Sequence, residues 1–428
     1  MIFHTGKHLL LCVFILFAVG AEGQRGQFQK DTLHITLDSA EHTFIQNNLL
    51  LLAQKYNIDA QKALIIQARL YPNPNINLNR GFYHPDSKKF FVGGTDGETS
   101  LGLSQLIILA GKRNKQIKIA ETNSKLAEYQ FYDLLRTLKY TLRTDFFNIY
   151  YMQQSAKVYD EEIRSLQQVV TAFQQQQGKG YISEKEIVRI KAQLYSLQSE
   201  YNDLVNQIND TQSELRLVLQ VKNYYVNPLA DDNQIAALNP TKYSLTTLID
   251  TAYTARTDIK IVKVTVDLSK QVYSLQKSLA VPDITLQSGY DEQGSYIHSF
   301  NSVGFGIDIP IFNRNQGNIK SAKYGIDINV TLEKSIEATV EEQVSRALLK
   351  TLDHDKLFKK IDPSFGKDFE RLMKEVVLNY QRRNIGLLDF IDFYDSYKQN
   401  TLQINKIKYN RVSAFEGLNF YTGTNFFN

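Results

Sequence analysis

Residues 183–220, which read SEKEIVRIKAQLYSLQSEYNDLVNQINDTQSELRLVLQ, hold the pattern that decides the fold. One set of side chains recurs through this stretch at alternating steps of three and four residues: Ile187, Ile190, Leu194, Leu197, Tyr201, Leu204, Ile208, Thr211, Leu215 and Val218. This spacing, kept over more than four heptads, is typical of a coiled-coil seam. The stretch therefore predicts a long helix that packs lengthwise against a neighbour.

The segment before this stretch supplies the neighbouring helix. From Lys112 to Gln177 the chain contains neither Pro nor Gly. The same spacing is kept by Ile117, Ala120, Ser124, Ala127, Phe131, Leu134 and Leu138. About 60 residues of helix would extend about 90 Å at 1.5 Å per residue, far longer than a helix of an ordinary globular domain. The small residues on this seam predict close helix contacts on more than one side, as in a wall of helices.

The composition agrees with long helices and excludes several classes of protein. The 428 residues include only 8 Pro and 22 Gly, shares below the averages of roughly 5% and 7%. Lys and Arg number 49 against 45 Asp and Glu, a formal net charge of +4, which is too balanced for a nucleic-acid partner. No stretch of about 18 consecutive apolar residues predicts a transmembrane helix after the N-terminal segment.

Residues 1–23 are predicted to be a signal peptide. Lys7 and His8 precede the apolar run 9–19, which small residues follow up to Gly23, the order of a secretory leader. Cleavage is expected after Gly23, with cleavage after Ala21 as the alternative. A buried N-terminal helix is the competing interpretation. The single cysteine, Cys12, lies inside the apolar run, so the mature chain is expected to hold neither a disulfide nor a thiolate metal site.

The rest of the chain is predicted to be a tandem repeat. A shift of 208 positions places Leu37 on Leu245 and Pro74 on Pro282 without a gap. Each half then reads helix, strand, loop, strand, long helix, tip and long helix, with the first helices predicted to open at Ile35 and at Tyr243. We divide the chain into a first repeat at 24–220, a linker or equatorial segment at 221–240, and a second repeat with a C-terminal tail at 241–428.

Four strands are predicted, two in each repeat, because apolar and polar residues alternate there with a period of two. They span 74–83, 99–109, 282–290 and 301–311. One interpretation is a sheet of a soluble α+β domain, and the other is a set of membrane strands. Four strands cannot close a barrel, for which about eight is the smallest well-filled size, so lipid-facing strands would have to be pooled between chains. A dimer would give eight strands and a trimer twelve.

Ordered motifs in both halves resemble the TolC-type outer-membrane efflux protein family, in its heavy-metal or multidrug branches. The resemblance covers nearly the whole mature chain. It rests on the segments Ile35-Thr36-Leu37-Asp38-Ser39-Ala40, Ala68-Arg69, Pro72-Asn73-Pro74, Gly102-Leu103-Ser104-Gln105, Gly111-Lys112-Arg113, Pro310-Ile311-Phe312-Asn313 and Asn315-Gln316-Gly317. Several lipid-anchored members carry a Cys at the mature N-terminus, and this chain has none there.

The resemblance implies a mainly α-helical protein with a membrane β-barrel. Long antiparallel coiled-coil helices in two structural repeats would contribute four strands per chain to a homotrimer with a 12-stranded barrel and an α-helical periplasmic tunnel. It implies an outer-membrane location in contact with lipid, and a tripartite efflux system with a periplasmic adaptor (membrane fusion protein) and an inner-membrane pump of RND or ABC type. A type I secretion conduit and a non-channel periplasmic coiled-coil adaptor or structural protein are the alternatives.

The tips of the two helical hairpins are the candidate site. Their turns contain Gly178 and Gly180 in the first repeat and Gly386 in the second. In the family an Asp-x-x-Asp pair lines the periplasmic entrance, which implies a gate at Asp389 and Asp392 with a weaker counterpart at Ser183 and Glu186. Arg382 and Arg383 are possible ion-pair partners of these acids in a closed state. Ordinary solvated acids at a helix start are the alternative.

The sequence predicts no enzyme. It contains no catalytic signature and requires no cofactor, and the five histidines of the expected mature chain show no metal-ligand spacing.

Overall fold

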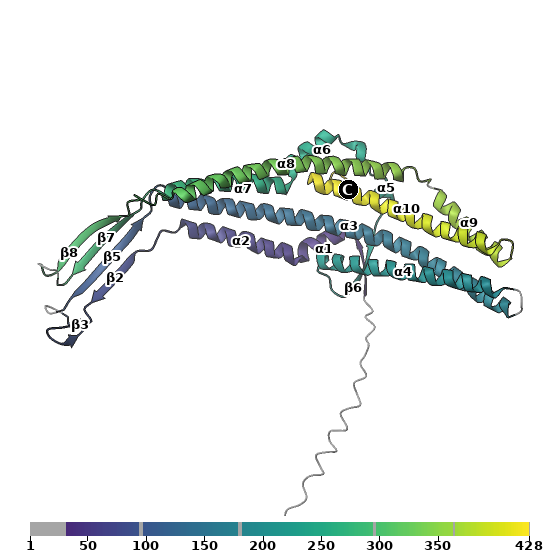
Figure 1. Cartoon of the computed structure of the whole chain (residues 1–428), viewed down its shortest axis with the longest axis horizontal. Helices are drawn as coiled ribbons and strands as arrows, with labels where there is room; N and C mark the ends of the chain where they lie inside the picture. The colour runs from purple at the N-terminus through teal and green to yellow at the C-terminus, as the bar shows by residue number, and fades with distance from the viewer. Residues whose placement is uncertain (1–30, 94–96, 179–181, 294–296, 363, 428) are drawn as a thin grey trace, which may run out of the picture.

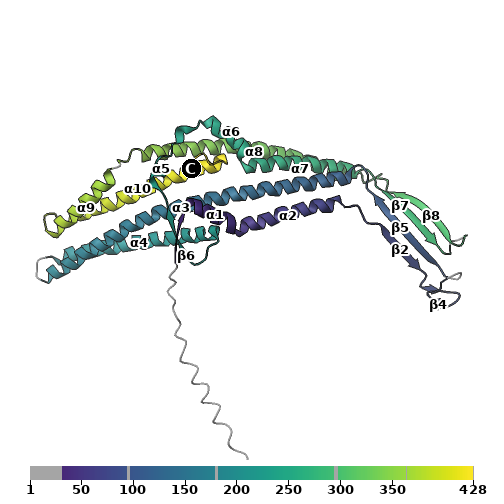
Figure 2. The same cartoon turned by 180° about the vertical axis from the view of Figure 1, so that it is seen from behind.

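The structure is a computed structural model that describes residues 31–93, 97–178, 182–293, 297–362 and 364–427. The predicted signal peptide and Gly180 lie outside the described residues. Figure 1 shows an elongated molecule with a β-sheet at one end and the turns of two helical hairpins at the other. Short elements and the C-terminus lie near the middle, and the view from behind in Figure 2 shows the same arrangement.

The first half of the chain runs from the middle to the sheet and then along the whole molecule. Its elements are β1 (Asp31–Thr36), α1 (Leu37–Asn47), α2 (Leu49–Arg69), β2 (Asn75–Arg80), β3 (Tyr83–His84), β4 (Lys89–Phe90), β5 (Thr99–Ile107), α3 (Lys112–Gln177) and α4 (Glu184–Leu219). The 66 residues of α3 form one uninterrupted helix, as the absence of Pro and Gly predicts.

The second half repeats this path after a short middle segment. That segment holds β6 (Tyr224–Leu229), α5 (Asp232–Ala236) and the 3-10 helix η2 (Pro240–Lys242). The elements that follow are α6 (Leu245–Ala255), α7 (Thr257–Leu279), β7 (Ile284–Asp291), β8 (Phe300–Ile307), α8 (Gln316–Phe358), α9 (Phe365–Gln381) and α10 (Leu387–Thr422). In the part of the chain that the structure describes, no helix is both long enough and apolar enough to span a bilayer.

Strands β2, β5, β7 and β8 form one antiparallel sheet in that order. Each overlaps one of the four strands predicted from the alternating pattern. The two halves meet at the β5–β7 pair, where Leu101 lies opposite Tyr290 and Gln105 opposite Leu286. Within the described chain β2 pairs only with β5, and β8 only with β7. Both outer strands therefore present a free edge.

The register places most apolar residues of the four strands on one face of the sheet, while Leu106 and Phe300 lie on the other. Leu78 pairs with Leu101, and Leu286 pairs with Phe305. The opposite face carries small and polar residues, among them Asn77, Ser104, Gln287 and Gly304. The apolar face is uncovered, since Val303 is 90% exposed and Phe305 is 72% exposed.

The predicted coiled-coil seam of α4 is confirmed. Ile187, Ile190, Leu194 and Leu197 are buried in one cluster with Leu166 of α3 and Phe390 of α10, so the two hairpins share a core near their tips. Two further buried clusters lie around the middle of the molecule, one for each half.

Three features of the fold differ from the sequence prediction. Ile35 and Thr36 do not open a helix but end β1, which pairs in parallel with β6 of the segment predicted as a linker. The first loop of the sheet contains the β3–β4 hairpin. The first long helix of the second half, which was predicted as one element, is divided into α8 and α9. Pro363, which lies between them in the sequence, lacks the N–H that an uninterrupted helix needs.

Both halves also divide their first helix at corresponding places. The break between α1 and α2 falls at Asn48, and that between α6 and α7 falls at Arg256, which are 256 − 48 = 208 positions apart. Asn48 caps α2 by accepting hydrogen bonds from the N–H groups of Leu50 and Leu51 at 3.0 and 3.1 Å. Its side-chain amide donates to the carbonyl of Val218 at the end of α4, at 2.8 Å.

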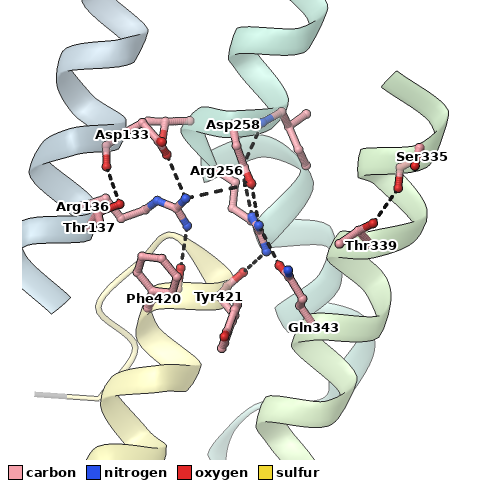
Figure 3. Close-up of polar contacts among 12 residues, drawn as sticks. Asp133, Arg136, Thr137, Arg256, Asp258, Ser335, Thr339, Gln343, Phe420 and Tyr421 are labelled. Carbon is pink, nitrogen blue, oxygen red and sulfur yellow. Dashed lines mark hydrogen bonds and ion pairs between the residues drawn. The ribbon is translucent and has the colours of Figure 1, made fainter. Parts of the chain in front are cut away.

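The break at Arg256 joins four helices, as Figure 3 shows. Arg256 donates to Asp258 of α7 at 2.6 Å, to Gln343 of α8 at 2.9 Å and to the carbonyl of Tyr421 of α10 at 3.1 Å. Beside it, Arg136 of α3 donates to the carbonyl of Phe420 at 2.9 Å. These contacts fix the hairpins to one another near the middle of the molecule.

Candidate functional site at the hairpin tips

The second tip turn presents two acids at the start of α10. Helix α9 ends at Gln381, and α10 begins at Leu387 with Gly386 as its N-cap. Asp389 and Asp392 follow, and both are exposed. Because they are three residues apart on one helix, their carboxylates lie on the same side of α10. Their position at a helix start also fits the alternative prediction of solvated acids that the helix dipole favours.

Of the two arginines that follow α9, Arg383 contacts the first hairpin. Arg382 caps the end of α9 through its backbone N–H, which donates to the carbonyl of Leu378. Arg383 donates from its guanidinium to the side-chain carbonyl of Gln176 of α3, at 3.2 Å. The second tip turn therefore contacts the last turn of α3. The predicted pairing of Arg382 and Arg383 with Asp389 and Asp392 in a closed state stays a prediction.

At the first tip, Gly178 is the C-cap of α3, and Ser183 and Glu186 form a capping box at the start of α4. The hydroxyl of Ser183 accepts from the N–H of Glu186 at 3.3 Å, and the Glu186 carboxylate accepts from the N–H of Ser183 at 3.2 Å. The hydroxyl of Ser183 also donates to that carboxylate at 2.9 Å. Glu186 is thus engaged in local capping, and its predicted role as a weaker counterpart of Asp389 and Asp392 stays a prediction.

We expect Ser183→Ala to destabilise the start of α4 by about 1 kcal/mol, the usual cost of losing an N-cap side chain. Hydrogen exchange of the amides of residues 184–187 should accelerate, while exchange at the middle of α4 should stay unchanged. Ser199→Ala, at an exposed position inside the same helix, is the control and should leave both rates unaltered. Equal exchange in wild type and Ser183→Ala would contradict the capping role.

An aromatic cluster directly behind the turns joins the two hairpins. Tyr380 of α9 stacks on Phe390 of α10 with ring centroids 4.3 Å apart and an interplanar angle of 12°. The ring centroid of Tyr380 also lies 5.0 Å from that of Phe173 of α3. Buried rings at both ends of the second tip turn hold α9 and α10 against α3.

Further from the tip, a buried polar cluster links α4 to α10. Lys398 is buried and lies 2.9 Å from the carboxylate of Glu200 and 3.6 Å from that of Asp395. Gln193 of α4 donates to Asp395 at 2.7 Å. This cluster was not predicted from the sequence. The charged residues Asp395 and Lys398, spaced by three within a helix rich in Phe and Tyr, are the signal that could have indicated it.

The side chains that the structure describes offer no ready-made metal centre. Among the described residues, no group of three or more His, Cys, Asp or Glu side chains is placed to hold a metal ion. What the tips present is a pair of exposed carboxylates in front of an aromatic cluster.

Comparisons with known proteins match this architecture. A sequence model of the family described as "Outer membrane efflux protein" matches residues 42–244. The cobalt-zinc-cadmium resistance protein CzcC of Cupriavidus metallidurans is 20% identical over 387 residues, which cover 88% of this chain and 85% of that protein.

Two solved structures share the fold. The CmeC outer membrane channel of Campylobacter jejuni superposes with a TM-score of 0.72 at 15% identity, over 91% of this chain and 86% of that one. A membrane protein from Pseudomonas aeruginosa superposes with a TM-score of 0.73 at 15% identity, over 90% and 92% of the two chains.

A mainly helical chain with long hairpins and one antiparallel sheet at its end has the architecture of an outer-membrane channel protein. Residues 42–244 match the outer membrane efflux protein family, a family of channel proteins rather than enzymes. The resemblance inferred from the sequence is thereby confirmed, and the protein is placed in the outer membrane.

Proposed function

We propose that three copies of this chain form the outer-membrane channel of a tripartite efflux system. The observation that carries the proposal is the sheet, which has two free edges and one exposed apolar face. A free edge in a bilayer leaves N–H and C=O groups unpaired at a cost of several kcal/mol each. Pairing β8 of one chain with β2 of the next removes every free edge when three chains close a ring.

The two faces of the sheet suit such a barrel. With Leu78, Leu101, Val303 and Phe305 turned outward, the apolar face meets lipid. The polar face with Asn77, Ser104 and Gln287 then lines the water-filled interior, as in barrels that conduct solutes. Twelve strands give a wider interior than the eight that a dimer would supply.

The helices would continue the barrel as a tunnel into the periplasm. In this proposal the two repeats, 24–220 and 241–428, each give one hairpin to the wall, and the segment 221–240 forms part of an equatorial belt. A periplasmic adaptor and an inner-membrane pump would deliver the cargo. The matched relative from Cupriavidus metallidurans is named for cobalt, zinc and cadmium resistance, so divalent metal ions are the cargo that we propose to assay first.

The tips would form the gate of this tunnel. Asp389 and Asp392 from three chains place six carboxylates around one axis, a ring that attracts cations and repels anions. Gly178, Gly180 and Gly386 lie in the turns that carry this ring, and Ser183 and Glu186 form its weaker part. Both aspartates are exposed, as a ring of carboxylates around a water-filled entrance requires.

We expect cysteines placed on the two free edges to crosslink neighbouring chains. Asn77→Cys in β2 is combined in turn with Ser302→Cys and Gly304→Cys in β8, which lie on the same polar face. A disulfide needs Cα atoms about 4.4–6.8 Å apart, a spacing that neighbouring strands provide. Mild oxidation of outer membranes should give a covalent trimer on denaturing gels for at least one pair.

Matched controls separate this result from chance oxidation. Each single variant should run as a monomer. The pair Ser104→Cys and Gln287→Cys lies within one chain, because Ser104 of β5 is opposite Gln287 of β7. It should form a disulfide and still run as a monomer on denaturing gels. If this pair oxidises while both edge pairs stay monomeric, the closed trimeric barrel is wrong.

A further inference from the structure

A hairpin rich in aromatic rings extends the sheet beside β2, at the end that faces away from the helices (Figures 1 and 2). It is formed by β3 and β4, and we call residues 82–91 the aromatic hairpin. Between ring centroids, Phe82 lies 5.3 Å from both Phe90 and Phe91, and Tyr83 lies 5.2 Å from Phe90. All four rings are nevertheless exposed, Phe82 at 64% and Phe90 at 62%. Exposed apolar clusters of this kind mark contacts with other proteins or with membranes.

The aromatic hairpin also has a basic side. Tyr83 pairs with Phe90, and His84 pairs with Lys89. Because neighbouring residues of a strand point to opposite sides, His84 and Lys89 lie on the side away from the rings of Tyr83 and Phe90. Lys88 and Lys89 are both exposed, and neither has an ion-pair partner among the described residues. The hairpin therefore presents exposed rings and unpaired ammonium groups next to each other.

In the proposed barrel, the aromatic hairpin lies at the level of the outer membrane surface. Strand β5 has 9 residues, and a tilted strand needs about 9–11 residues to cross the hydrocarbon core. The pairing of β2 with β5 ends at Arg80 and Thr99, shortly before the hairpin begins at Phe82. Since the helices of the proposed channel extend into the periplasm, this end of the sheet faces the outer leaflet. Barrel proteins place aromatic rings at this depth.

Arg80 connects the aromatic hairpin to the apolar face of the sheet. It follows Leu78 by two positions in β2, so it lies on the same face as Leu78 and Leu101. Its guanidinium donates to the carbonyl of Phe91 at 2.9 Å, which holds the second arm of the hairpin at the outer end of that face. Tyr290, opposite Leu101, adds another exposed ring at the same end. The rings thus continue the face that meets lipid in the proposed barrel.

We propose that the aromatic hairpin binds the outer surface of the membrane, with its rings between acyl chains and headgroups and with Lys88 and Lys89 on the phosphate groups of anionic lipids. This inference rests on the proposed barrel and adds a lipid contact beyond the barrel wall. Aromatic side chains suit a depth at which one side is apolar and the other is wet. Residues 80–91 hold three cationic side chains, Arg80, Lys88 and Lys89, against one acid, Asp86. This excess of positive charge attracts an anionic lipid surface.

Tryptophan fluorescence in proteoliposomes tests the depth of the hairpin, because the chain contains no Trp and an introduced Trp reports alone. Phe91→Trp places the reporter in the hairpin, Val303→Trp places it near the middle of β8, and Tyr195→Trp places it on α4; all three side chains are exposed. Lipids brominated near the headgroup quench shallow rings, and lipids brominated near the chain end quench deep ones. We expect the shallow bromines to quench Phe91→Trp more strongly, the deep bromines to quench Val303→Trp more strongly, and neither to quench Tyr195→Trp.

The outcomes separate the hairpin contact from the barrel. Quenching of Val303→Trp without quenching of Phe91→Trp would overturn the inference and leave the barrel intact, because the rings would then face the mouth of the barrel or a neighbouring chain. Absence of quenching for both would contradict the barrel, and the lipid contact of the hairpin with it. Phe90→Trp repeats the measurement on a neighbouring ring, so the test does not depend on the folding of one variant.

The lysines are tested through the preference of the hairpin for anionic lipid. In mixed vesicles of phosphatidylglycerol and phosphatidylcholine, bromine is placed first on one lipid and then on the other, and the ratio of the two quenching values of Phe91→Trp measures the preference. One lysine near an anionic surface contributes about fivefold in affinity. Lys88→Gln with Lys89→Gln, added to Phe91→Trp, should therefore lower the preference by about fivefold or more. Lys55→Gln with Lys185→Gln removes the same charge from exposed positions of α2 and α4 and should keep it. An equal preference in all three backgrounds would overturn the phosphate contact.

Discussion

Replacing Arg411 with Met is expected to lower the free energy of unfolding by about 3–5 kcal/mol, the range found when one partner of a buried ion pair is removed. Arg411 is 0% exposed in the middle of α10. Its guanidinium lies 2.8 Å from the carboxylate of Asp355 on α8. The variant would leave that carboxylate with Lys359 as its ion-pair partner, on a side chain that is largely exposed to solvent.

Arg411 also holds the segment that joins the two halves. It donates to the carbonyl of Ile235 at 2.6 Å and to that of Leu238 at 2.7 Å. Its guanidinium packs 4.5 Å from the ring of Phe358 and 5.1 Å from that of Phe415. Because these carbonyls would also lose their donor, we expect Arg411→Met to cost more than Asp355→Asn, which removes the carboxylate alone.

Thermal melting of the helical circular dichroism signal in detergent measures the effect. A loss of this size should lower the midpoint by roughly 5–10 °C in a chain of this length. Arg371→Met removes an exposed arginine that pairs with Glu375 at 3.5 Å and should change stability by less than about 1 kcal/mol, as surface ion pairs do. An equal midpoint for Arg411→Met and Arg371→Met would refute the anchoring role.

The long elements of this fold could be predicted because their signals are local and repeated. The seam from Ile187 to Val218 specifies a helix through its own spacing, and ten positions agree with each other. In the predicted strands apolar and polar residues alternate over eight or more residues. The register of the sheet places these two sets on opposite faces, as the alternation predicts. In both cases a long pattern leaves little room for another structure.

The breaks and anchors could not be predicted because their causes lie far away in the sequence. Asn48 ends α1 where its amide reaches the carbonyl of Val218, which is 170 residues away. Arg411 is buried because Asp355 and the carbonyls near residue 235 meet it in space. In the sequence, Glu162 is one acid among many on a polar-rich helix. Only the packing of α9 and α10 against α3 shows that it is buried and unpartnered.

The tip could be predicted only in part. A turn with Gly386 followed by two acids is visible in the sequence, and the structure places both aspartates on one exposed side of α10. The aromatic stack of Tyr380 on Phe390 behind them depends on two helices that the turn brings together. A gate and ordinary solvation both place these acids at the surface of a single chain, and the conductance of the assembled channel distinguishes them.

Neutralising the acids at the tip should remove most of the block of the channel by multivalent cations. In the proposed trimer, Asp389→Asn with Asp392→Asn replaces six carboxylates around one axis with neutral amides. Two unit charges 4 Å apart interact by about 4 kcal/mol at an effective dielectric constant of 20. Loss of such a ring should therefore weaken the binding of a trivalent cation by about tenfold or more, and single-channel conductance should rise as mutual repulsion and bound counter-ions disappear.

Planar bilayer recordings with a trivalent cation added on the side of the tips measure both quantities. Asp203→Asn with Asp368→Asn removes the same formal charge from exposed positions on α4 and α9 and is the matched control. Asp368 lies in the first turn of α9, at the end opposite the tip. We expect this control to keep the wild-type conductance and the wild-type block. If the tip double variant also keeps both, Asp389 and Asp392 are solvated acids at a helix start, and other groups set the ion selectivity of the tunnel entrance. If block weakens in the tip variant alone, the charge responsible lies at the start of α10, where Ser183 and Glu186, already engaged in their own cap, could not replace it.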